Sequence, residues 1–577
     1  MATAATYFPY SELNNGKPST LNEFRRELGA YARSRILHLC SALNAMLRSE
    51  DDDFINQKAH DGLVRAFFEP QVAEHLLRKD GDVRFVFYRQ QILFVAKTAV
   101  LICPEEGLVP GQAEFRRLGK IFLMAGDHLP TLQAKPEPLD DKFVFFASHF
   151  VPVQEASGFH RFDHKIARSY KMLMECAPKI RNGAGPHLDL ADIFEETTKL
   201  PLLTFLSLLF GSLARFNKFD PQAFVKDPRS YGLNKTWFAT TKIPTESIDR
   251  FLALVSTTPA EFRSAYEKAN QGPSDFTPFR DRPLFRDGDY LFLIDFAFLA
   301  EKFETGPFWI IHNSLPDKPS KDGLHAFWGR VFEKYGCDVL NATADQGRNV
   351  VYESPNFTDM GKGQVCDAIV VCGSSAAFIE LKGSTFSSRA KYGGDYLQLK
   401  VELDRKLVED GDGSPKAVLQ LKRAIELTCG KDRSEPINDV DLSRVRYVYP
   451  VIVTRDDIGS TLGVNAFLQI RFDAVAQRKQ MKKIVTPMFC MNAEDLERLT
   501  AYFHDTLFTD LLEAHYRASR EHGEYLVNPY FSAGNNAILK EKGIRRPEVH
   551  VHSWHELADS AAEHLGLQPE GDIGTAI

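Results

Sequence analysis

The chain lacks the cysteine patterns that bind zinc or build a disulfide framework. Its 577 residues include only eight cysteines, scattered along the chain without a C-x-x-C pair. Zinc ribbons and disulfide-rich domains need closely spaced cysteines. Cys366 and Cys372 bracket one expected strand, and an extended strand would hold them too far apart to bond. We therefore expect reduced thiols, as in a cytoplasmic protein.

Several common signals of function are missing as well. The sequence contains no Walker loop, no G-x-G-x-x-G after an apolar strand and no G-x-S-x-G. The phosphate-binding loops of nucleotide enzymes and the nucleophile turn of serine hydrolases are therefore absent. The formal net charge is −7. Without an overall positive field, any binding of nucleic acid has to come from local basic patches.

A secretion signal and long hydrophobic runs are also lacking. The N-terminus, MATAATYFPYSELNN, has no basic start followed by an apolar core. The most apolar stretch, residues 200–213, contains Pro201 and Gly211 and is shorter than the about 20 residues that cross a bilayer. We expect this stretch to form a buried helix, and we expect a cytoplasmic protein with no membrane partner.

The length of the chain predicts more than one domain. Residues 1–315 show mainly helical patterns, and Thr20 and Thr258 each begin a capping box with a glutamate three residues later. The stretch from Pro316 to Gly323 is rich in turn-forming residues and is the best linker candidate. We therefore expect a mainly α-helical domain of unknown role at 1–315. A second domain at 316–577 would hold an α/β core at about 324–455 and an α/β extension.

One segment, residues 365–383 (VCDAIVVCGSSAAFIELKG), contains two carboxylates and a lysine that are expected to lie close together. Apolar runs on both sides of the small residues 372–375 predict a tight antiparallel hairpin. Side chains alternate along a strand, so Glu380 and Lys382 share one face near the end of the second strand. Asp367, at the start of the first strand, is then expected to lie beside Glu380.

These residue types together indicate a metal-dependent phosphodiesterase. Two neighbouring carboxylates resist ionisation unless a cation lies between them. Oxygen ligands favour Mg²⁺ or Mn²⁺ over zinc. A divalent ion held by Asp367 and Glu380 can polarise a phosphate and lower the pKa of a bound water. Lys382 can orient that water or neutralise the charge that builds up on the phosphorane.

An aspartate, a spacer, and a glutamate one residue before a lysine resemble the signature of the PD-(D/E)XK nuclease superfamily, which has the restriction-endonuclease-like fold. Asp367, Glu380 and Lys382 stand at these positions, and Cys366 replaces the proline of the signature. The resemblance implies that the Leu381 carbonyl is a third metal ligand. Taken singly, the same residues also fit ordinary roles, as a charged pair on an exposed edge strand and a turn aspartate.

The elements around the hairpin follow the superfamily's order of helix, hairpin, helix and strand. Upstream, residues 324–335 (LHAFWGRVFEKY) place five apolar side chains on one helical stripe. Glu333 falls off this stripe, on the side of Gly329, where a small residue lets the helix approach closely. In many relatives a glutamate here joins the metal site, so the resemblance implies a supporting catalytic role for Glu333. A core strand is expected at 447–453 (YVYPVIV).

Two groups of residues are candidates for binding nucleic acid. Lys416, Gln420 and Arg423 share one face of the helix KAVLQLKRAIEL. The resemblance implies that a glutamine or lysine on this helix faces the site or the phosphate backbone. Arg389 and Lys391 follow the second strand of the hairpin and are candidates for gripping phosphate.

The region after residue 455 continues with an α/β pattern. A strand is expected at 486–491, and Asn492 is expected to cap a helix that extends to Arg517. Basic residues gather in RKQMKK, residues 478–483, and again at 540–546. Contact with phosphate and a solvated positive face are both open for these clusters.

The spacing of the histidines does not predict a zinc site. His160 and His164 have no carboxylate or cysteine at a matching distance in the sequence, so we expect surface or capping roles. Residues 548–552 (EVHVH) alternate and predict a strand, and a capping box is expected at 553–556. This pattern accounts for the three histidines of the region, His550, His552 and His555.

The sequence therefore predicts a metal-dependent endonuclease that uses Mg²⁺ or Mn²⁺. DNA is favoured over RNA because most of the superfamily cuts DNA, and a ribonuclease stays open. A large helical domain attached to such a nuclease resembles bacterial restriction or antiphage (antiviral) defence, where it would sense a trigger or restrain cutting. The alternative is a catalytically silent nuclease-fold subunit for nucleic-acid binding or assembly. A homo-oligomer and a complex with a partner subunit are both open.

Overall fold

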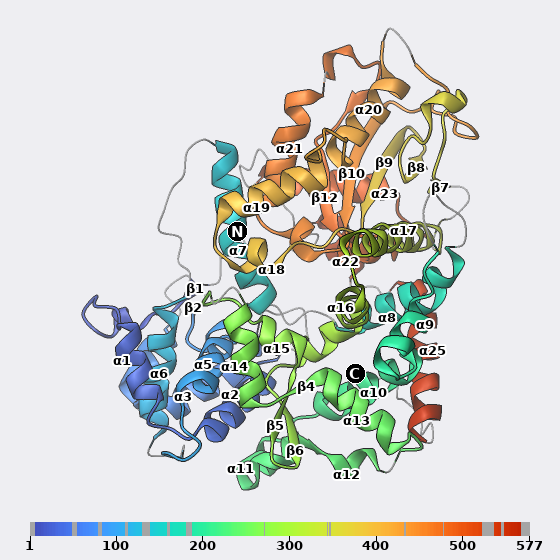
Figure 1. The fold of residues 1–577 in the computed structure, drawn as a ribbon. Coiled ribbons are helices and arrows are strands. Elements are labelled where there is room, and N and C mark those ends of the chain that lie inside the picture. The colour runs from blue at the N-terminus through green and yellow to red at the C-terminus, as the bar shows by residue number, and fades with distance from the viewer. Residues whose placement is uncertain are drawn as a thin grey trace.

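A computed structural model describes most of the 577 residues. The described residues are 6–48, 55–78, 84–109, 114–129, 139–157, 162–180, 187–239, 241–269, 272–342, 344, 348–431, 434–476, 478–521, 536–543 and 547–566. Figure 1 shows the helical N-terminal half, blue to green, in the lower part of the view. A sheet with flanking helices, yellow to orange, occupies the upper part. The chain thus combines α-helical and α/β regions, as predicted.

Helices dominate the first half of the chain. Both predicted capping boxes are present, since Thr20 caps α1 and Thr258 caps α14 with the reciprocal glutamate contacts. The helices are α1 Leu21–Leu28, α2 Arg33–Leu47, α3 Gln57–Phe67, α4 Pro70–Leu76, α5 Arg89–Ile102, α6 Phe115–Gly126, α7 Leu139–Ser157, α8 Phe162–Tyr170, α9 Leu190–Thr198, α10 Leu202–Asn217, α11 Pro221–Lys226, α12 Lys235–Phe238, α13 Thr245–Val255, α14 Pro259–Lys268, α15 Thr277–Asp281 and α16 Phe296–Ser314.

Two small sheets interrupt this helical half. β1 (Thr6–Tyr7) pairs with β2 (Arg84–Phe85) in parallel. A four-stranded mixed sheet has the order β3–β6–β5–β4. Its strands are β3 Gly232–Asn234, β4 Ser256–Thr257, β5 Leu284–Asp287 and β6 Tyr290–Leu293. Strands of two to four residues are too short for an alternating pattern to stand out, so the sequence did not predict them.

A six-stranded mixed sheet forms the centre of the second half. Its strands are β7 Val350–Glu353, β8 Ala368–Cys372, β9 Ser375–Lys382, β10 Tyr447–Thr454, β11 Ile484–Val485 and β12 Phe489–Asn492. β7, β8 and β9 are antiparallel neighbours, whereas β10 runs parallel to β9 and pairs in parallel with β11 and β12. The strand predicted at 447–453 is therefore confirmed as β10, and the one at 486–491 corresponds to β12.

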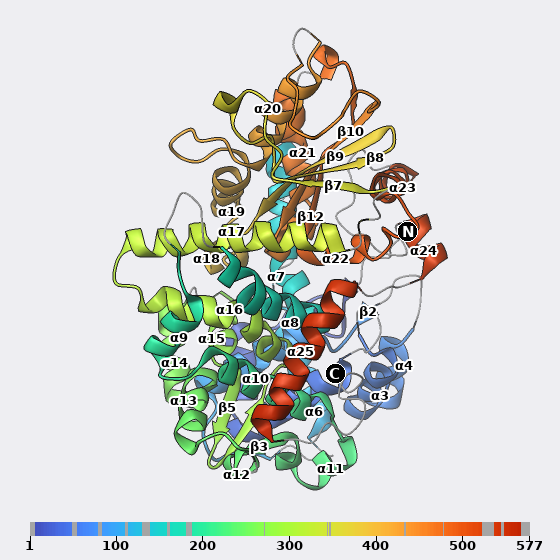
Figure 2. The ribbon, with the colours of Figure 1, turned by 90° about the vertical axis from the view of Figure 1, so that its right-hand side faces the viewer.

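Helices cover both faces of this sheet. Ile379 and Leu381 of β9 share a core with α17, while Phe378 of β9 shares another core with α20 and α21. Figure 2 shows α17 lying across the molecule between the sheet and the N-terminal half. The helices of this part are α17 Lys318–Ala342, α18 Ser388–Tyr392, α19 Tyr396–Leu403, α20 Ala417–Cys429, α21 Val464–Val475, α22 Ala493–Thr500, α23 Phe508–Glu521, α24 Ala537–Lys542 and α25 Glu548–Leu565.

The linker expected at 316–323 is wrong, because α17 begins at Lys318. Asp317 starts the helix: its side chain accepts a hydrogen bond from the Ser320 N–H at 2.8 Å. Aspartate before a helix and proline in its first turn favour helix initiation, so the same residues that suggest a turn also begin a helix. Packing continues across residue 315, since the rings of Phe308 in α16 and Trp328 in α17 lie 5.5 Å apart.

The C-terminal elements depart most from expectation. Residues 548–552 are the first turns of α25 and not a strand, and 553–556 lie inside that helix and cap nothing. α25 returns to the N-terminal half, where the rings of Trp554 and Phe210 in α10 are 5.3 Å apart. Asn492 caps α22 as predicted, but this helix ends at Thr500 and a separate helix, α23, follows.

The helix expected at 200–213 is confirmed as α10, most of whose side chains are buried. In the part of the chain that the structure describes, no single helix is both long and apolar enough to cross a membrane. α9 and α10, bent by 78° with respect to each other, satisfy the length and composition requirement only as a pair.

Candidate active site at the open end of the β8–β9 hairpin

The predicted hairpin forms between β8 and β9. Gly373 in its two-residue turn has φ of +59°, a left-handed conformation that tight hairpin turns require and glycine adopts easily. At the other end, the Asp367 N–H donates to the Ile379 carbonyl at 3.1 Å and extends the ladder beyond β8. The hairpin therefore delivers Asp367 to the end of β9 that carries Glu380 and Lys382.

Asp367, Glu380 and Lys382 lie together at this end. Lys382 Nζ is 2.6 Å from Glu380 Oε2 and 3.8 Å from Asp367 Oδ2. The Leu381 N–H donates to Asp367 Oδ2 at 2.8 Å. Glu380 is 3% exposed and Asp367 9%. β9 is also a central strand with β8 and β10 on either side, which excludes the ordinary interpretation as a charged pair on an exposed edge strand.

Helix α17 comes very close to the end of β9. A Cβ atom on Gly336 would lie 2.7 Å from Leu381 Cδ1, and one on Gly383 would lie 3.0 Å from Gly329 Cα. A side chain at either position would require its neighbours to move, so glycine is what allows the close approach seen here. The five apolar side chains of the predicted stripe are all buried, namely Leu324, Phe327, Trp328, Val331 and Tyr335.

This packing places Glu333 among the other charged groups of the site. Burial, with the Asp367 carboxylate, raises the pKa of Glu333 to about 7, while Lys382 opposes the shift. Burial also raises the pKa of Glu380 to about 8, and Lys382 again opposes the shift. Burial would lower the pKa of Lys382, but Glu380, Asp367 and Glu333 raise it, so its ammonium is charged at neutral pH. The site thus holds three carboxyl groups around one cation.

Removing the Glu333 charge is expected to stabilise the metal-free protein above neutral pH. The Glu333 pKa rises from 4.5 unfolded to about 7 folded, so ionisation of this carboxyl costs stability as the pH rises through that window. In EDTA at pH 8, Glu333→Gln should raise the free energy of unfolding by on the order of 2 kcal/mol. Thermal melts at pH 8 and pH 4.5 check this, because the gain should vanish at the lower pH. Equal gains at both would show that the charge is not responsible.

The Leu381 carbonyl faces the same open end. Carbonyl groups two residues apart on a strand point to the same side. The Ile379 carbonyl accepts the Asp367 N–H, so the Leu381 carbonyl also points towards Asp367, past the first residue of β8. Asp367 and Glu380 of the predicted set therefore lie at the same end of β9 as the Leu381 carbonyl.

Two further residues touch the site and were missed in the sequence. Gln364 Nε2 donates to Asp367 Oδ1 at 3.2 Å and holds that carboxylate from the other side. Arg455, 4% exposed, donates its backbone N–H to the Lys382 carbonyl at 2.9 Å. Gln364 lies in an irregular segment with no periodic signal. Arg455 did have a sequence signal. It is a charged residue directly after the mainly apolar run 447–454, and it marks the end of that strand as Lys382 marks the end of β9.

Arg389 and Lys391 lie on α18, which follows β9 at the end that carries the acidic site. Arg389 is exposed. Lys391 Nζ is 3.3 Å from both carboxylate oxygens of Asp456, at the end of β10. Of the predicted nucleic-acid contacts, this pair is the one that the chain places next to the site.

The three residues predicted on α20 have other contacts. Lys416 Nζ pairs with Asp410 Oδ2 at 3.0 Å, and the exposed Arg423 donates to the Lys362 carbonyl at 3.3 Å. The Gln420 Oε1 atom is buried and has no hydrogen-bond partner among the described residues. α20 covers the face of β9 that also carries Phe378 and Glu380, but none of these contacts joins the three residues to Asp367 or Lys382.

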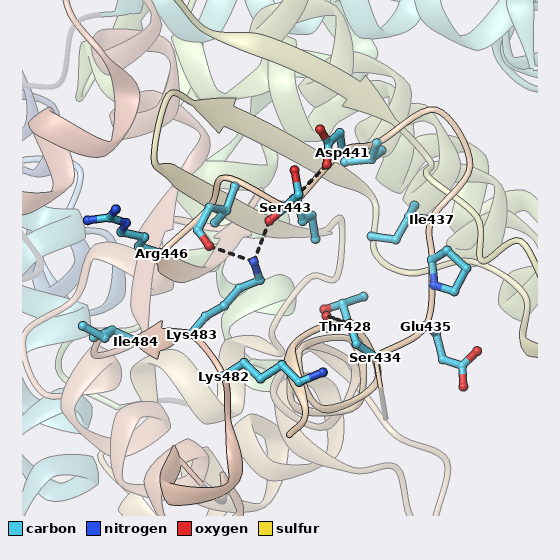
Figure 3. Close-up of a pocket in the computed structure, with 14 residues that line it drawn as sticks. Thr428, Ser434, Glu435, Ile437, Asp441, Ser443, Arg446, Lys482, Lys483 and Ile484 are labelled. Atoms are coloured by element: carbon cyan, nitrogen blue, oxygen red, sulfur yellow. Dashed lines mark hydrogen bonds between the residues drawn. The ribbon is translucent and has the colours of Figure 1, made fainter. Parts of the chain in front are cut away.

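The basic cluster at 478–483 lies at the opposite end of the sheet. Lys482 and Lys483, with Arg446, line a pocket of about 730 Å³ (Figure 3). The Arg446 N–H donates to the carbonyl of Ser374 in the hairpin turn. The length of β9, about 23 Å, therefore separates this pocket from the acidic site. In the second cluster, Lys542 pairs with Asp505 at 2.9 Å, whereas Arg545 and Arg546 lie outside the described residues.

The histidine predictions also change. His160 lies outside the described residues. His164 is 2% exposed and His550 6%, and their Nδ1 atoms are 3.2 Å apart. The expectation of a surface or capping role is therefore wrong for His164. Residues 548–552, predicted as a strand that contains His550, are part of the helix α25. His552 and His555 are exposed on that helix.

Comparisons with protein-family models, with curated proteins and with solved structures gave no match for this chain. The resemblance to the PD-(D/E)XK superfamily therefore rests on the residues named above and on their arrangement. A function for this site has to be argued from its own geometry and chemistry.

Proposed function

We propose that this chain is a metal-dependent nuclease with a restriction-endonuclease-like core. The observation that carries the proposal is the meeting of Asp367, Glu380 and Lys382 at the buried end of a central strand. Glu333 joins them from the helix that precedes the hairpin. The order α17, β8–β9, α20 and β10 also agrees with the order of elements in that superfamily.

The donors at this end of β9 fit a hard divalent cation. They are carboxylate and carbonyl oxygens, and the raised pKa values of Glu333 and Glu380 mean that a nearby positive charge would stabilise their ionised forms. Asp367, Glu380 and the Leu381 carbonyl would hold Mg²⁺ or Mn²⁺, supported by Glu333. When bound, such an ion supplies Lewis acidity to the phosphate and makes a bound water more acidic.

The remaining chemistry belongs to Lys382 and Glu333. The Lys382 ammonium keeps its charge at neutral pH and projects into the carboxylate cluster. It is placed to donate a hydrogen bond to an attacking water and to stabilise the negative charge that develops on the phosphate. The Glu333 carboxyl, which the metal would keep ionised, can accept a proton from a neighbouring group.

DNA is the proposed substrate, by analogy with most of the superfamily. Arg389 and Lys391 would contact the phosphates next to the scissile bond, because α18 follows β9 directly at the site. The DNA would reach the α20 residues only farther along, beyond the phosphates next to the scissile bond; these residues are Lys416, Gln420 and Arg423. The helical N-terminal half would sense a trigger or restrain cutting in an antiphage or restriction system, alone, as a homo-oligomer or with a partner subunit.

A catalytically silent nuclease-fold subunit is the alternative, and one observation favours it. Lys382 already lies 2.6 Å from Glu380 and 3.8 Å from Asp367, so it can neutralise the carboxylates without a metal. Such a cluster would serve the fold, and the protein would bind nucleic acid without cleaving it.

Cleavage assays with several substrates test the proposal. Supercoiled plasmid, linear duplex, single-stranded DNA and RNA would each be incubated with the full chain in Mg²⁺, Mn²⁺ or EDTA. The proposal expects cleavage of DNA with either metal and none in EDTA. Cleavage of RNA alone would correct the substrate. Binding without cleavage in any metal would favour the silent subunit.

A further inference from the structure

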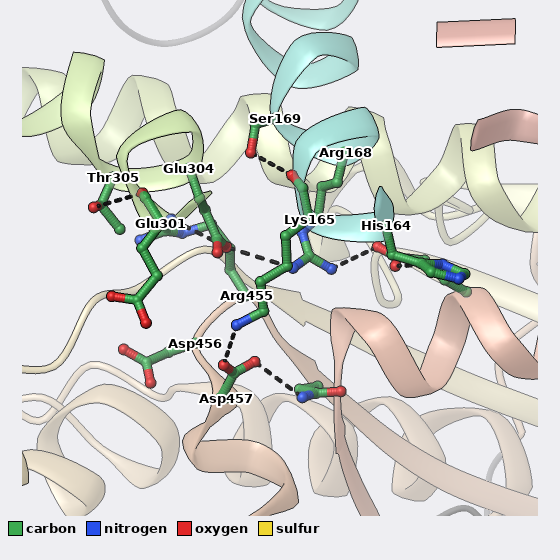
Figure 4. A network of polar contacts seen from close by, with 12 residues as sticks. His164, Lys165, Arg168, Ser169, Glu301, Glu304, Thr305, Arg455, Asp456 and Asp457 are labelled. Atoms are coloured by element: carbon green, nitrogen blue, oxygen red, sulfur yellow. Dashed lines mark hydrogen bonds and ion pairs between the residues drawn. The ribbon is translucent and has the colours of Figure 1, made fainter. Parts of the chain in front are cut away.

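A second polar cluster lies beside α17, where the Tyr335 hydroxyl contacts it. His164 of α8, Glu497 of α22 and His550 of α25 come together although they are far apart in the sequence. One possible ligand atom from each lies within 4.8 Å of the other two. The three residues are 2%, 0% and 6% exposed. Figure 4 shows His164 beside Arg168, in the network of charged side chains that joins α8 and α16 to the end of β10.

The distances suit a small cation with nitrogen and oxygen ligands. Zinc bonds of about 2.0–2.1 Å at tetrahedral angles put two ligand atoms about 3.3 Å apart. The Nδ1 atoms of His164 and His550 are 3.2 Å apart, and His164 Nδ1 is 4.0 Å from Glu497 Oε2. The two imidazole nitrogens share a hydrogen bond at a separation that zinc ligands also have, so a cation would take the place of the shared proton, with the Glu497 oxygen next to it.

Glu497 has an oxygen left over for such a cation. Its Oε1 accepts hydrogen bonds from Arg168 at 2.7 Å and from the Tyr335 hydroxyl at 2.6 Å. Its Oε2 has no hydrogen-bond partner among the described residues, although the side chain is fully buried. A buried carboxylate oxygen without a partner is unfavourable, and a metal ion is one of the few groups that satisfy it. This oxygen is the one that faces His164.

The hydrogen bonds around the cluster also set the tautomer of His550. The Tyr335 hydroxyl has one proton, which it donates to Glu497. At its 2.8 Å contact with His550 Nε2 it must therefore accept, which places the ring proton on Nε2. The lone pair of His550 Nδ1 then points into the cluster. Histidine ligands of metals commonly have their second nitrogen held in this way.

Burial acts differently on the two ionisable ligands: it keeps His550 neutral, whereas it raises the pKa of Glu497 to about 7, so a cation beside Glu497 would stabilise its ionised form. Burial, with His164, Arg168 and Lys171, lowers the pKa of His550 well below its usual value, so the ring is neutral at neutral pH. Arg168 is the nearest cation, and besides Glu497 it faces Glu304 at 3.6 Å. The positive charge of Arg168 is therefore shared between two carboxylates and does not dominate the site.

We propose that His164, Glu497 and His550 bind a Zn²⁺ ion that fixes α25 to α8 and α22. Two imidazoles and a carboxylate are a donor set that zinc accepts in proteins. The burial of all three residues indicates a structural rather than a catalytic ion. The ion would also support α17 through Tyr335, two residues beyond Glu333.

Metal analysis of the purified full chain tests this proposal. We expect about one zinc ion per chain in the wild type and in Asp367→Asn, and almost none in Glu497→Gln. Zinc affinity should fall by about 100-fold or more in Glu497→Gln and His550→Gln. His552→Gln is the matched control, since His552 is exposed on the same helix and should leave binding unchanged.

A measurement on the wild type alone keeps the test independent of how the variants fold. Co²⁺ added to metal-free protein should give the visible absorption of a four- or five-coordinate ion, and X-ray absorption of the zinc form should show nitrogen and oxygen ligands including two imidazoles. Wild-type protein that binds neither Zn²⁺ nor Co²⁺ at equimolar concentration would overturn the proposal. So would zinc with sulfur ligands, or equal zinc content in folded Glu497→Gln.

Discussion

Lys382→Ala is expected to reduce metal-dependent cleavage by about 1,000-fold or more, because it removes the charge that stabilises the developing phosphorane. Lys382 is not a predicted metal ligand, so the variant should still bind Mn²⁺. Its melting temperature in EDTA should change little, since losing the cation beside Glu380 is offset by protonation of a carboxyl whose pKa is already raised. Single-turnover cleavage and Mn²⁺ titration of the same preparation measure both properties.

The matched control for this variant is Lys422→Ala. Lys422 lies on α20 and pairs with Glu426 one turn later at 3.1 Å, away from the carboxylate cluster. The Lys422→Ala variant should therefore cleave DNA at the wild-type rate. If both alanine variants lost activity equally, the effect would come from the general charge of the protein and not from the position of Lys382.

Gly336→Ala is expected to damage both stability and activity, although alanine is normally the better helix former. The new methyl would lie 2.7 Å from Leu381 Cδ1 and 2.9 Å from Cδ2, which forces α17 away from β9 or moves Leu381. Overpacking of this kind costs about 1–3 kcal/mol. Because Leu381 donates to Asp367 through its N–H, cleavage should fall as well, by about tenfold or more.

A second substitution in the same helix separates packing from helix propensity. A Cβ on Gly323 would meet nothing within 4 Å, so Gly323→Ala should be neutral or stabilise the protein by up to about 1 kcal/mol. Leu381→Ala combined with Gly336→Ala should lose less stability than the two single variants together, because the smaller side chain makes room for the methyl. Thermal melts and cleavage rates of these variants and of the wild type check this. A harmless Gly336→Ala would show that the contact does not position the site.

The hairpin and its charged residues were predictable because their signals are local. Alternation places Glu380 and Lys382 on one face, and small residues at 372–375 mark the turn. The stripe of α17 and the strand β10 followed from equally plain periodicity. The meeting of Asp367 with Glu380 needed only the register of one hairpin, which a two-residue turn fixes.

Two kinds of feature were missed: one that needed a longer stretch of sequence and others that depend on distant contacts. Residues 548–552 alternate like a strand, yet the buried positions of α25 repeat at helical spacing through His550, Trp554, Leu557 and Ala561. Reading the periodicity over a longer window would have found the helix. The contact between His164 and His550 spans 386 residues and has no signature in local spacing. Gln364 and the close approach at Gly336 likewise depend on tertiary packing.

A nuclease of this kind requires the carboxylates at the end of β9 to hold a divalent ion for phosphodiester hydrolysis. Calorimetric titration of Mn²⁺ into the metal-free wild type and into Asp367→Asn tests this requirement most directly, because asparagine keeps an acceptor for the Leu381 N–H while removing the charge. We predict a binding isotherm in the wild type that is lost in Asp367→Asn. Equal Mn²⁺ binding by both proteins, or none by the wild type, would contradict a divalent-ion site at Asp367 and Glu380.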